Sequence, residues 1–264
     1  MHLVLPSTVI SLSTLASVLG SWRQTRWRSS ATSEETRMRA LIASGSGRYS
    51  DPWHPFDRTS PIIADILRTA GFNVSVDDDV DHAMSTLQNI DLLVVNAGDP
   101  WRGEQDAAPV PTDAVEGFAA ALARGLGVLA LHCAVSSLRD YPDWFPAIGG
   151  MWVPGLSFHP PASRTHITGG TLPDGTTIAP FDVFDEGYCR IQEIGRNHTV
   201  AHHHQTRHAH RAAWTRTQCA SRIAVDLLGH DERSYESDGH ARMLISLAHW
   251  ASGGLGEAAV KIRV

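Results

Sequence analysis

Short apolar runs alternate with amphipathic stretches through the first half of the chain. The runs at residues 39–43, 72–76, 91–96 and 127–131 have the length of strands, and 91–96 and 127–131 are apolar enough to be covered on both faces. The stretches between them, at residues 60–71, 80–87 and 112–125, carry apolar side chains at helical spacing. The order β-α-β-α-β-α-β predicts an α/β fold with an open, doubly wound, mostly parallel sheet flanked by helices.

Local signals place the ends of the first helix and the elements of the second half. Ser60 followed by Pro61 is typical of a capped helix start, so the first helix is expected to begin there. Residues 239–252 predict a terminal amphipathic helix. The less regular region before it is expected to contribute strands at residues 157–168, 188–194, 199–205, 212–216 and 223–228.

The N-terminal segment differs from the rest of the chain. Residues 1–33 contain no acidic side chain, and their apolar stretch precedes its arginines, whereas a secretory signal has positive charge first. The apolar stretch is also too short and too polar for a membrane-spanning helix. We therefore expect residues 1–37 to be a disordered extension and residues 38–264 to form a single domain.

Composition narrows the compartment and the partners. The formal net charge of −6 and the pI near 6.2 give no general attraction to nucleic acid. The chain has three widely spaced cysteines, which argues against a disulfide framework and favours a reducing compartment. These features predict a cytoplasmic protein without nucleic-acid or membrane partners.

Ligands of doubly wound sheets bind beyond the carboxyl ends of the strands, so polar residues there are the first candidates for a site. They are a histidine directly after the strand at 127–131, an asparagine ending the strand at 91–96, and polar residues in the loops after the first and last strands. The irregular middle adds a histidine and two carboxylates. The set is His54, Asn96, Asp99, His132, His159, Asp185, Glu186, His230, Asp231 and Glu232.

Several of these residues also have a purely structural interpretation. His132 could simply bond to nearby backbone, Glu186 could be an exposed loop acid, and His230 with Asp231 could form a capped turn before the last helix. If His132, Glu186 and His230 share a small space, two imidazoles and a carboxylate make an acid–base set or a site for a divalent ion such as zinc.

Two further features point less clearly to chemistry. Cys133 follows His132, and its side chain is expected to face the other way, as a small buried group without a nucleophilic role. Six histidines lie between residues 198 and 210, and His202 and His204 would share one face of a strand. Because no cysteine or carboxylate lies among them, a solvated hairpin is expected there in preference to a metal site.

An ordered set of motifs resembles the trehalose-utilisation, or ThuA-like, family over about residues 38–252. The most specific motif is the run from Leu228 to Tyr235. The set consists of Trp53-His54-Pro55, the run Gly127–His132, Phe158-His159-Pro160, Asp185-Glu186-Gly187-Tyr188, Ala213-Trp214-Thr215-Arg216 and Leu228-Gly229-His230-Asp231-Glu232-Arg233-Ser234-Tyr235.

The resemblance implies a fold similar to class I glutamine amidotransferases, a flavodoxin-like α/β sandwich. In those enzymes a cysteine nucleophile follows the strand that corresponds to residues 127–131, whereas here the position is taken by His132, so amidotransferase chemistry is not expected. Family members usually read Asp-Glu-Leu-Tyr where this chain has Gly187 in place of leucine, which leaves the local packing open. The family implies a link to disaccharide catabolism and 3-keto sugars.

The leading hypothesis is therefore a cytoplasmic enzyme that acts on a sugar or keto-sugar by histidine and carboxylate acid–base chemistry. Expected catalytic residues are His132, Glu186, His230 and Asp231. Expected substrate-binding residues are Trp53, His54, Asn96, Trp101, Trp152 and His159. A metal, where present, would be held by His132, His159, Glu186 and His230. The alternative is a non-catalytic sugar-binding or regulatory protein on the same scaffold. The expected partner is a small-molecule carbohydrate, and the sequence leaves homo-oligomerisation open.

Overall fold

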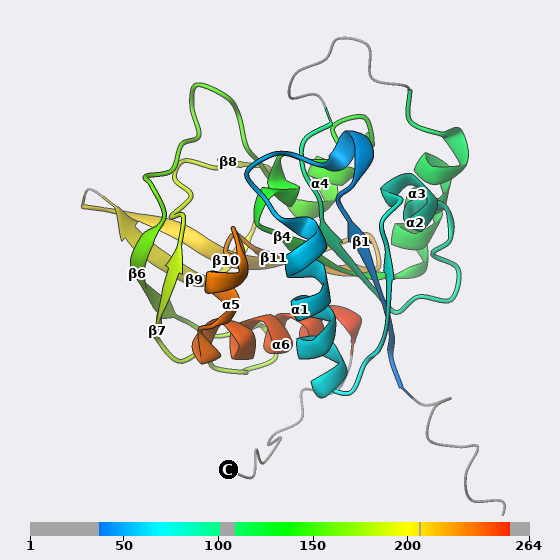
Figure 1. Ribbon diagram of the computed structural model, residues 1–264. Helices are drawn as coiled ribbons and strands as arrows, with labels where there is room; N and C mark the ends of the chain where they lie inside the picture. Colours follow the sequence, from blue (N-terminus) through cyan, green and yellow to red (C-terminus); the bar gives the residue numbers. More distant parts are fainter. Residues whose placement is uncertain (1–36, 101–108, 206, 254–264) are drawn as a thin grey trace, which may run out of the picture. The chain divides into compact units, whose positions relative to one another are not determined.

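A computed structural model of the chain describes residues 37–100, 109–205 and 207–253. Its central sheet has nine strands in the order β2-β1-β3-β4-β11-β10-β9-β6-β7, and a separate two-stranded sheet pairs β5 with β8 (Figure 1). The strands are β1 (Arg39–Ser44), β2 (Asn73–Asp77), β3 (Leu92–Asn96), β4 (Gly127–Leu131), β5 (Gly150–Met151), β6 (Ser163–Gly169), β7 (Phe181–Asp185), β8 (Gln192–Glu193), β9 (His198–Gln205), β10 (His208–Gln218) and β11 (Ser221–Asp226).

The sheet has a parallel half and an antiparallel half. Strands β2, β1, β3, β4 and β11 pair in parallel, and β11, β10, β9, β6 and β7 pair antiparallel. The strand order switches at β1: β2 lies on one side of it, and β3 lies on the other. This is the point where a doubly wound sheet opens a crevice at the carboxyl ends of its strands. The predicted fold class is confirmed.

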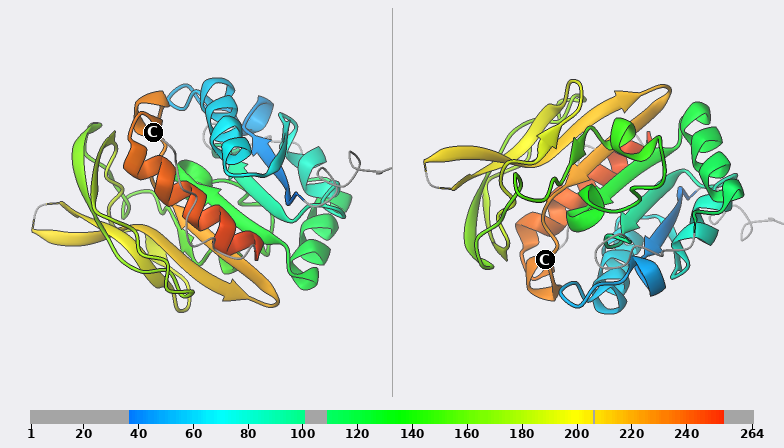
Figure 2. Two further views of the ribbon diagram at one scale, coloured as in Figure 1. Left: turned by 90° about the horizontal axis from the view of Figure 1, so that it is seen from below. Right: turned by 90° about the horizontal axis from the view of Figure 1, so that it is seen from above.

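Helices cover both faces of the parallel half (Figures 1 and 2). Side chains of α1 and α6 join one apolar core, and those of α2, α3 and α4 join the other, so alternate residues of the central strands are buried in opposite directions. The helices are α1 (Phe56–Thr69), α2 (Val80–Ser85), α3 (Thr112–Arg124), α4 (Trp144–Ile148), α5 (Glu232–Tyr235) and α6 (Asp238–Ser252), with the 3₁₀ turns η1 (Gly47–Tyr49) and η2 (His132–Val135). Among the described residues, no helix is both long and apolar enough to cross a bilayer.

The first helix begins earlier than its sequence signal indicates. Helix α1 starts at Phe56, and Pro61 lies inside it, so the expected start at Ser60 is wrong. Ser60 is 1% exposed, and its hydroxyl bonds to Ser44 and accepts a hydrogen bond from the Asn96 amide at 2.9 Å. The hydroxyl therefore joins α1 to the ends of β1 and β3 instead of capping the helix.

Two expected strands also differ in extent. Of the strand expected at 157–168, the structure forms Ser163–Gly169, and of the one expected at 188–194 it forms Gln192–Glu193. An isolated antiparallel bridge also joins Phe158 to Cys189. Strand β7 was not predicted, because its sequence places acids beside aromatics. Its buried residues Phe181, Val183 and Asp185 alternate with exposed ones, so a carboxylate occupies an inward position. Residues 1–36 lie outside the described residues, and the extension over 1–37 stays a prediction.

A buried ion pair joins α6 to the end of β11. The Nε2 atom of His240 lies 3.0 Å from Asp226 Oδ2, both side chains are fully buried, and Nδ1 lies 3.0 Å from the Ser234 carbonyl oxygen. Burial alone would lower the pKa of His240, but Asp226, Asp185 and the Ser234 carbonyl raise it above its usual value. Since the unfolded pKa is about 6.5, the pair stabilises fully below that pH and loses its contribution as the pH rises through the folded-state pKa.

His240→Leu should lower the free energy of unfolding by about 3–5 kcal/mol near pH 6, because it leaves the Asp226 charge buried without its partner. The difference from wild type should shrink as the pH rises above about 6.5 and through the raised folded-state pKa of His240, because the wild-type pair then loses its proton. Urea denaturation across this range measures both effects. His166→Leu, at a pair with 64% of the histidine side chain exposed, is the control and should change little. A loss of unfolding free energy in His240→Leu that grows with pH would contradict the raised pKa of His240.

Candidate functional site

His132 occupies a strained position directly after β4. Its φ of 44° lies in the left-handed region that few residues other than glycine adopt, and its side chain is 1% exposed. Ring atom Nδ1 donates to the Leu227 carbonyl oxygen at 2.8 Å, so Nε2 is the acceptor nitrogen of the neutral ring. The sharp turn after β4 therefore presents a buried imidazole at its first position.

His54 is oriented by Asp51 in the loop between β1 and α1. Asp51 Oδ2 accepts the His54 Nδ1 hydrogen at 2.7 Å, and Oδ1 accepts the backbone N–H groups of Trp53 and His54 at 2.9 Å each. With Nδ1 occupied, the free acceptor of the neutral ring is Nε2. A carboxylate behind an imidazole in this way is the usual support for a metal-binding histidine.

Asp185 at the end of β7 brings the remaining pieces together. It is 1% exposed; Oδ1 accepts the Glu186 N–H, and Oδ2 accepts the Gly229 N–H, both at 2.7 Å, and also the Ser234 hydroxyl. Gly229 has a φ of 119°, and a Cβ there would lie 2.5 Å from the Tyr235 hydroxyl, so the turn requires glycine. This turn places His230 against Glu186.

Four side chains from distant segments meet at one point. Glu186 Oε2 lies 3.7 Å from His132 Nε2 and 3.3 Å from His230 Nδ1, and the His54 ring centroid is 5.0 Å from those of both histidines. One ligand atom from each of His54, His132, Glu186 and His230 lies within 4.8 Å of all the others. We call this set the histidine cluster.

Three ring nitrogens and the Glu186 carboxylate face one another within the cluster. His54 Nε2, His132 Nε2 and His230 Nδ1 are buried without a hydrogen-bond partner in the described part of the chain, and a carboxylate faces them. Such an arrangement is costly unless a proton or a cation lies between the groups. Three neutral imidazoles and one carboxylate are ligands suited to zinc and similar divalent ions, whose bonds of about 2.0–2.2 Å bring co-ligands to separations like these.

The protonation of the cluster follows from burial and mutual charge. Burial acts against the charged form of His54, but Cys133 and Asp51 raise its pKa to about 9. Burial also acts against the charged form of His132, but Glu186 and Asp185 raise its pKa above the usual value. Burial acts to raise the pKa of Glu186, but the nearby histidines, His132 above all, lower it. The pKa of His230 is lowered by burial and, next, by the charge of His132. Protons therefore occupy the cluster near neutral pH, and a bound cation would displace them.

His159 lies beside the histidine cluster and outside the four-ligand set in which it was predicted. Its Nδ1 is 3.3 Å from Glu186 Oε1 and 3.0 Å from the Pro160 carbonyl oxygen, and 36% of the side chain is exposed. Trp152 and Tyr188 flank it, with ring centroids 5.8 and 5.6 Å away. Conversely, His54, predicted only to bind substrate, lies within the cluster.

Other predicted residues have structural partners. The Asn96 amide is buried and donates to Thr59 and Ser60, and the Asp231 carboxylate caps α5 by accepting the Arg233 N–H at 2.9 Å. The capped-turn interpretation therefore describes Asp231, and in the described part of the chain neither side chain hydrogen-bonds to a member of the cluster. Trp53 is 62% exposed, and Trp101 lies outside the described residues.

Cys133 does not point away as predicted. Its Sγ donates to the Ala97 carbonyl oxygen at 3.3 Å and lies within 4.8 Å of ligand atoms of Asp51 and His54. The error comes from extending strand alternation past the strand: residues 132–135 form the 3₁₀ turn η2, in which successive side chains do not alternate between two faces.

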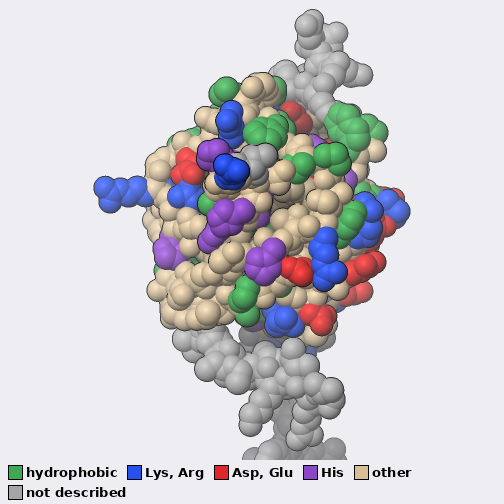
Figure 3. Space-filling view, turned by 90° about the vertical axis from the view of Figure 1, so that its left-hand side faces the viewer, with side chains coloured by type: hydrophobic (Ala, Val, Ile, Leu, Met, Phe, Trp, Pro, Cys, Tyr) green, Lys and Arg blue, Asp and Glu red, His purple; other side chains and the backbone are tan. Residues whose placement is uncertain are grey.

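The histidine-rich segment forms the hairpin of β9 and β10. The rings of His202 and His204 lie 5.3 Å apart on one face, as the spacing predicts. Figure 3 shows histidine side chains gathered on the side that carries β6, β7, β9 and β10. Within residues 37–100, 109–205 and 207–253, the hairpin histidines belong to no group of three close metal ligands.

One hairpin histidine compensates for the missing leucine at Gly187. His203 is 1% exposed, and its Nε2 donates to the Tyr188 carbonyl oxygen at 3.0 Å. A Cβ on Gly187 would lie 2.9 Å from the His203 ring, so the ring occupies the space that a side chain at 187 would need. His203 thereby packs under the segment that carries Glu186 and Tyr188.

The sequence analysis missed two residues that shape the site, Asp51 and Tyr188, and it selected Asp185 without a role. The Tyr188 ring lies 4.3 Å from the His132 ring and 4.8 Å from that of Trp152. Signals for both were present, because Asp51 precedes His54 by three residues, as in an Asx turn, and Tyr188 follows Glu186 by two.

Comparison with known proteins identifies the family. The model of the family described as trehalose utilisation, ThuA, matches residues 39–251. The chain belongs to the ThuA family. This confirms the resemblance drawn from the ordered motifs. No curated protein matches the sequence.

Solved structures of ThuA-like proteins have the same fold. One from Parabacteroides merdae has 15% sequence identity and a TM-score of 0.67, over 85% of this chain and 94% of that one. One from Bacteroides uniformis has 11% identity and a TM-score of 0.56, over 82% and 91%. A cytoplasmic protein of Salmonella typhimurium has 10% identity and a TM-score of 0.51, over 81% and 99%. At these identities the likeness concerns the fold alone.

Asp185→Asn should destabilise this ThuA protein by about 1–3 kcal/mol, because an amide cannot accept all three hydrogen bonds that the buried carboxylate accepts. The midpoint of urea denaturation measures the loss. Asp182→Asn is the matched control, since Asp182 is the exposed acid of the same strand and its change should leave the midpoint where it is. Equal midpoints for both variants would show that Asp185 does not hold the site together.

Proposed function

We propose that this ThuA-family protein is an enzyme that acts on a sugar or keto-sugar through the histidine cluster, with the assistance of a divalent cation. One observation carries the proposal: three buried imidazole nitrogens without a hydrogen-bond partner in the described part of the chain face one carboxylate. The family's description as trehalose utilisation supports a carbohydrate substrate. We also propose a cytoplasmic location, because Cys133, Cys189 and Cys219 are all unpaired.

His54, His132, Glu186 and His230 would hold the cation, and Asp51 would keep the His54 ring in its acceptor tautomer. A zinc-like ion in this place supplies polarisation of a substrate carbonyl. The two oxygens of Glu186 have different neighbours, since Oε2 faces His132 and His230 while Oε1 faces His159.

His159 is the group placed to move a proton beside that carbonyl. Two acceptors, Glu186 Oε1 and the Pro160 carbonyl oxygen, surround its Nδ1, so Nε2 of the neutral ring is free to act as a base. Its partial exposure makes it reachable from solvent, whereas His132 is fully enclosed. Trp152 and Tyr188 offer aromatic faces on which the apolar side of a sugar ring can pack.

Cation binding tests the first half of the proposal. Protein stripped with a chelator should bind about one Zn²⁺ or Mn²⁺ per chain in calorimetry, and His132→Ala should abolish this binding. Asp51→Asn should weaken it by about 10- to 100-fold, because the His54 ring loses its supporting acceptor. His202→Ala, on the exposed hairpin, is the control and should bind as wild type. Stoichiometric binding that survives in His132→Ala would place the cation elsewhere.

Turnover of a keto-disaccharide made by oxidising trehalose tests the second half. His159→Ala should reduce kcat by at least about 100-fold while cation binding is retained, because the proton-transfer group is lost. Cys133→Ser should keep at least about a tenth of the activity, since losing a true nucleophile costs several orders of magnitude. Substrate binding without turnover in the wild type would favour the non-catalytic sugar-binding alternative. A collapse in Cys133→Ser would point to thiol chemistry instead.

A further inference from the structure

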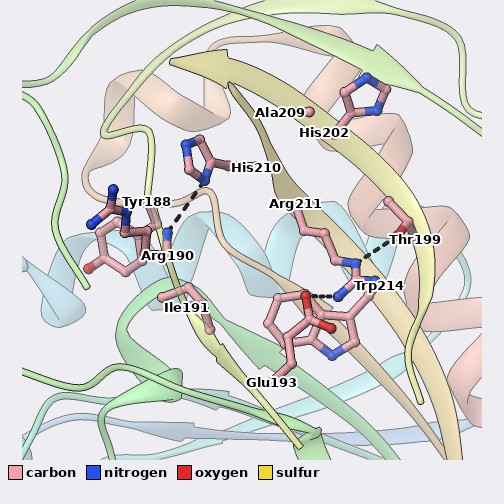
Figure 4. Close-up of a pocket in the computed structure, with 10 residues that line it drawn as sticks. All are labelled: Tyr188, Arg190, Ile191, Glu193, Thr199, His202, Ala209, His210, Arg211 and Trp214. Atoms are coloured by element: carbon pink, nitrogen blue, oxygen red, sulfur yellow. Dashed lines mark hydrogen bonds and ion pairs between the residues drawn. The ribbon is translucent and has the colours of Figure 1, made fainter. Parts of the chain in front are cut away.

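A pocket of about 470 Å³ lies between the β9–β10 hairpin and the segment that follows Glu186 (Figure 4). Its volume falls within the range of about 300–1,000 Å³ that is usual for small-molecule sites. Tyr188, Ile191 and Trp214 form an apolar wall, and Tyr188 and Trp214 are held rigidly because they are 6% and 2% exposed. This pocket is distinct from the histidine cluster, none of whose members line it.

Fixed hydrogen-bonding groups face this wall. The Arg211 guanidinium pairs with Glu193, and its Nε donates to the Thr199 hydroxyl at 2.7 Å, so a donor and an acceptor are set side by side (Figure 4). In the described part of the chain, no hydrogen bond occupies the ring nitrogens of His202, which also lines the pocket. The pocket thus combines donors and acceptors in planar groups that are already oriented.

Three charged side chains line the pocket, and two of them form an ion pair with each other. Glu193 offsets Arg211, and the remaining cation, Arg190, lies over the Phe158 ring with its guanidinium carbon 5.8 Å from the centroid. A neutral ligand with alternating hydroxyl groups and an apolar face matches both the paired donor and acceptor and the aromatic wall. A pyranose ring has this chemistry.

We propose that the pocket is a second sugar site, which binds a neutral hexose unit apart from the histidine cluster. The class of ligand rests on the proposed function. The Tyr188 ring separates the two sites: it lines the pocket and lies 4.3 Å from the ring of His132. A sugar in the pocket therefore contacts a side chain that packs directly on the cluster.

The experiment measures D-glucose and trehalose binding by calorimetry and by tryptophan fluorescence. Ala209 is exposed and lines the pocket, so Ala209→Trp should fill it and weaken binding by at least about tenfold. Glu193→Ala and His202→Ala should each weaken binding by about three- to tenfold through lost hydrogen bonds. His204→Ala is the control, on the same hairpin but outside the lining, and should bind within about twofold of wild type.

His132→Ala separates the two sites. The proposal expects this variant to retain the sugar binding that Ala209→Trp weakens, because the cluster does not line the pocket. Binding that Ala209→Trp leaves intact but His132→Ala abolishes would overturn the second site while supporting sugar chemistry at the cluster. The absence of saturable binding in the wild type would also overturn it. Binding lost in Ala209→Trp in a protein with no turnover would uphold the pocket and refute the proposed enzyme.

Discussion

The site depends on one buried carboxylate. Asp185 accepts hydrogen bonds from Glu186, Gly229 and Ser234, and the partners at 229 and 234 lie 44 and 49 residues further along the chain. These bonds tie the antiparallel half of the sheet to the loop that leaves its last parallel strand. Together with the Ser237 hydroxyl, which donates to the Asp182 carbonyl oxygen, and Arg233, which lies over the Phe184 ring, they hold Glu186 and His230 at 3.3 Å. A charge inside the protein is tolerated here because three donors satisfy it.

The cluster built on this carboxylate balances two opposing tendencies. Burial favours neutral imidazoles, which are good ligands, while nearby carboxylates favour protonated ones. Asp51 contributes to both: it raises the pKa of His54, and it also turns the ring so that Nε2 is the free acceptor. A cation competes with protons for the same lone pairs, so occupancy and protonation are two descriptions of one equilibrium.

The sequence predicted those parts of the molecule that follow strand periodicity. The parallel strands, the α/β class and the gathering of polar residues at carboxyl ends follow from apolar runs and their spacing, which is why His132 and His230 could be selected. Prediction failed where the backbone leaves regular structure. The 3₁₀ turn after β4 reversed the expected direction of Cys133, and a buried hydroxyl at Ser60 imitated a helix cap. His54 lies in the cluster and His159 lies beside it, the reverse of the prediction, because loop geometry sets both positions and the hydrophobic pattern does not predict loop geometry.

The packing of Gly187 against His203 has a consequence for how such a sequence can change. A side chain at 187 and an imidazole at 203 need the same space, since a Cβ at 187 would lie 2.9 Å from the ring. Substitutions at the two positions are therefore epistatic: gaining a side chain at 187 first gives an overpacked intermediate, and losing the ring first gives a cavity. Either order passes through a less stable protein, but only the cavity leaves room for the second change. A lineage moving between the two arrangements should therefore alter the hairpin before the loop.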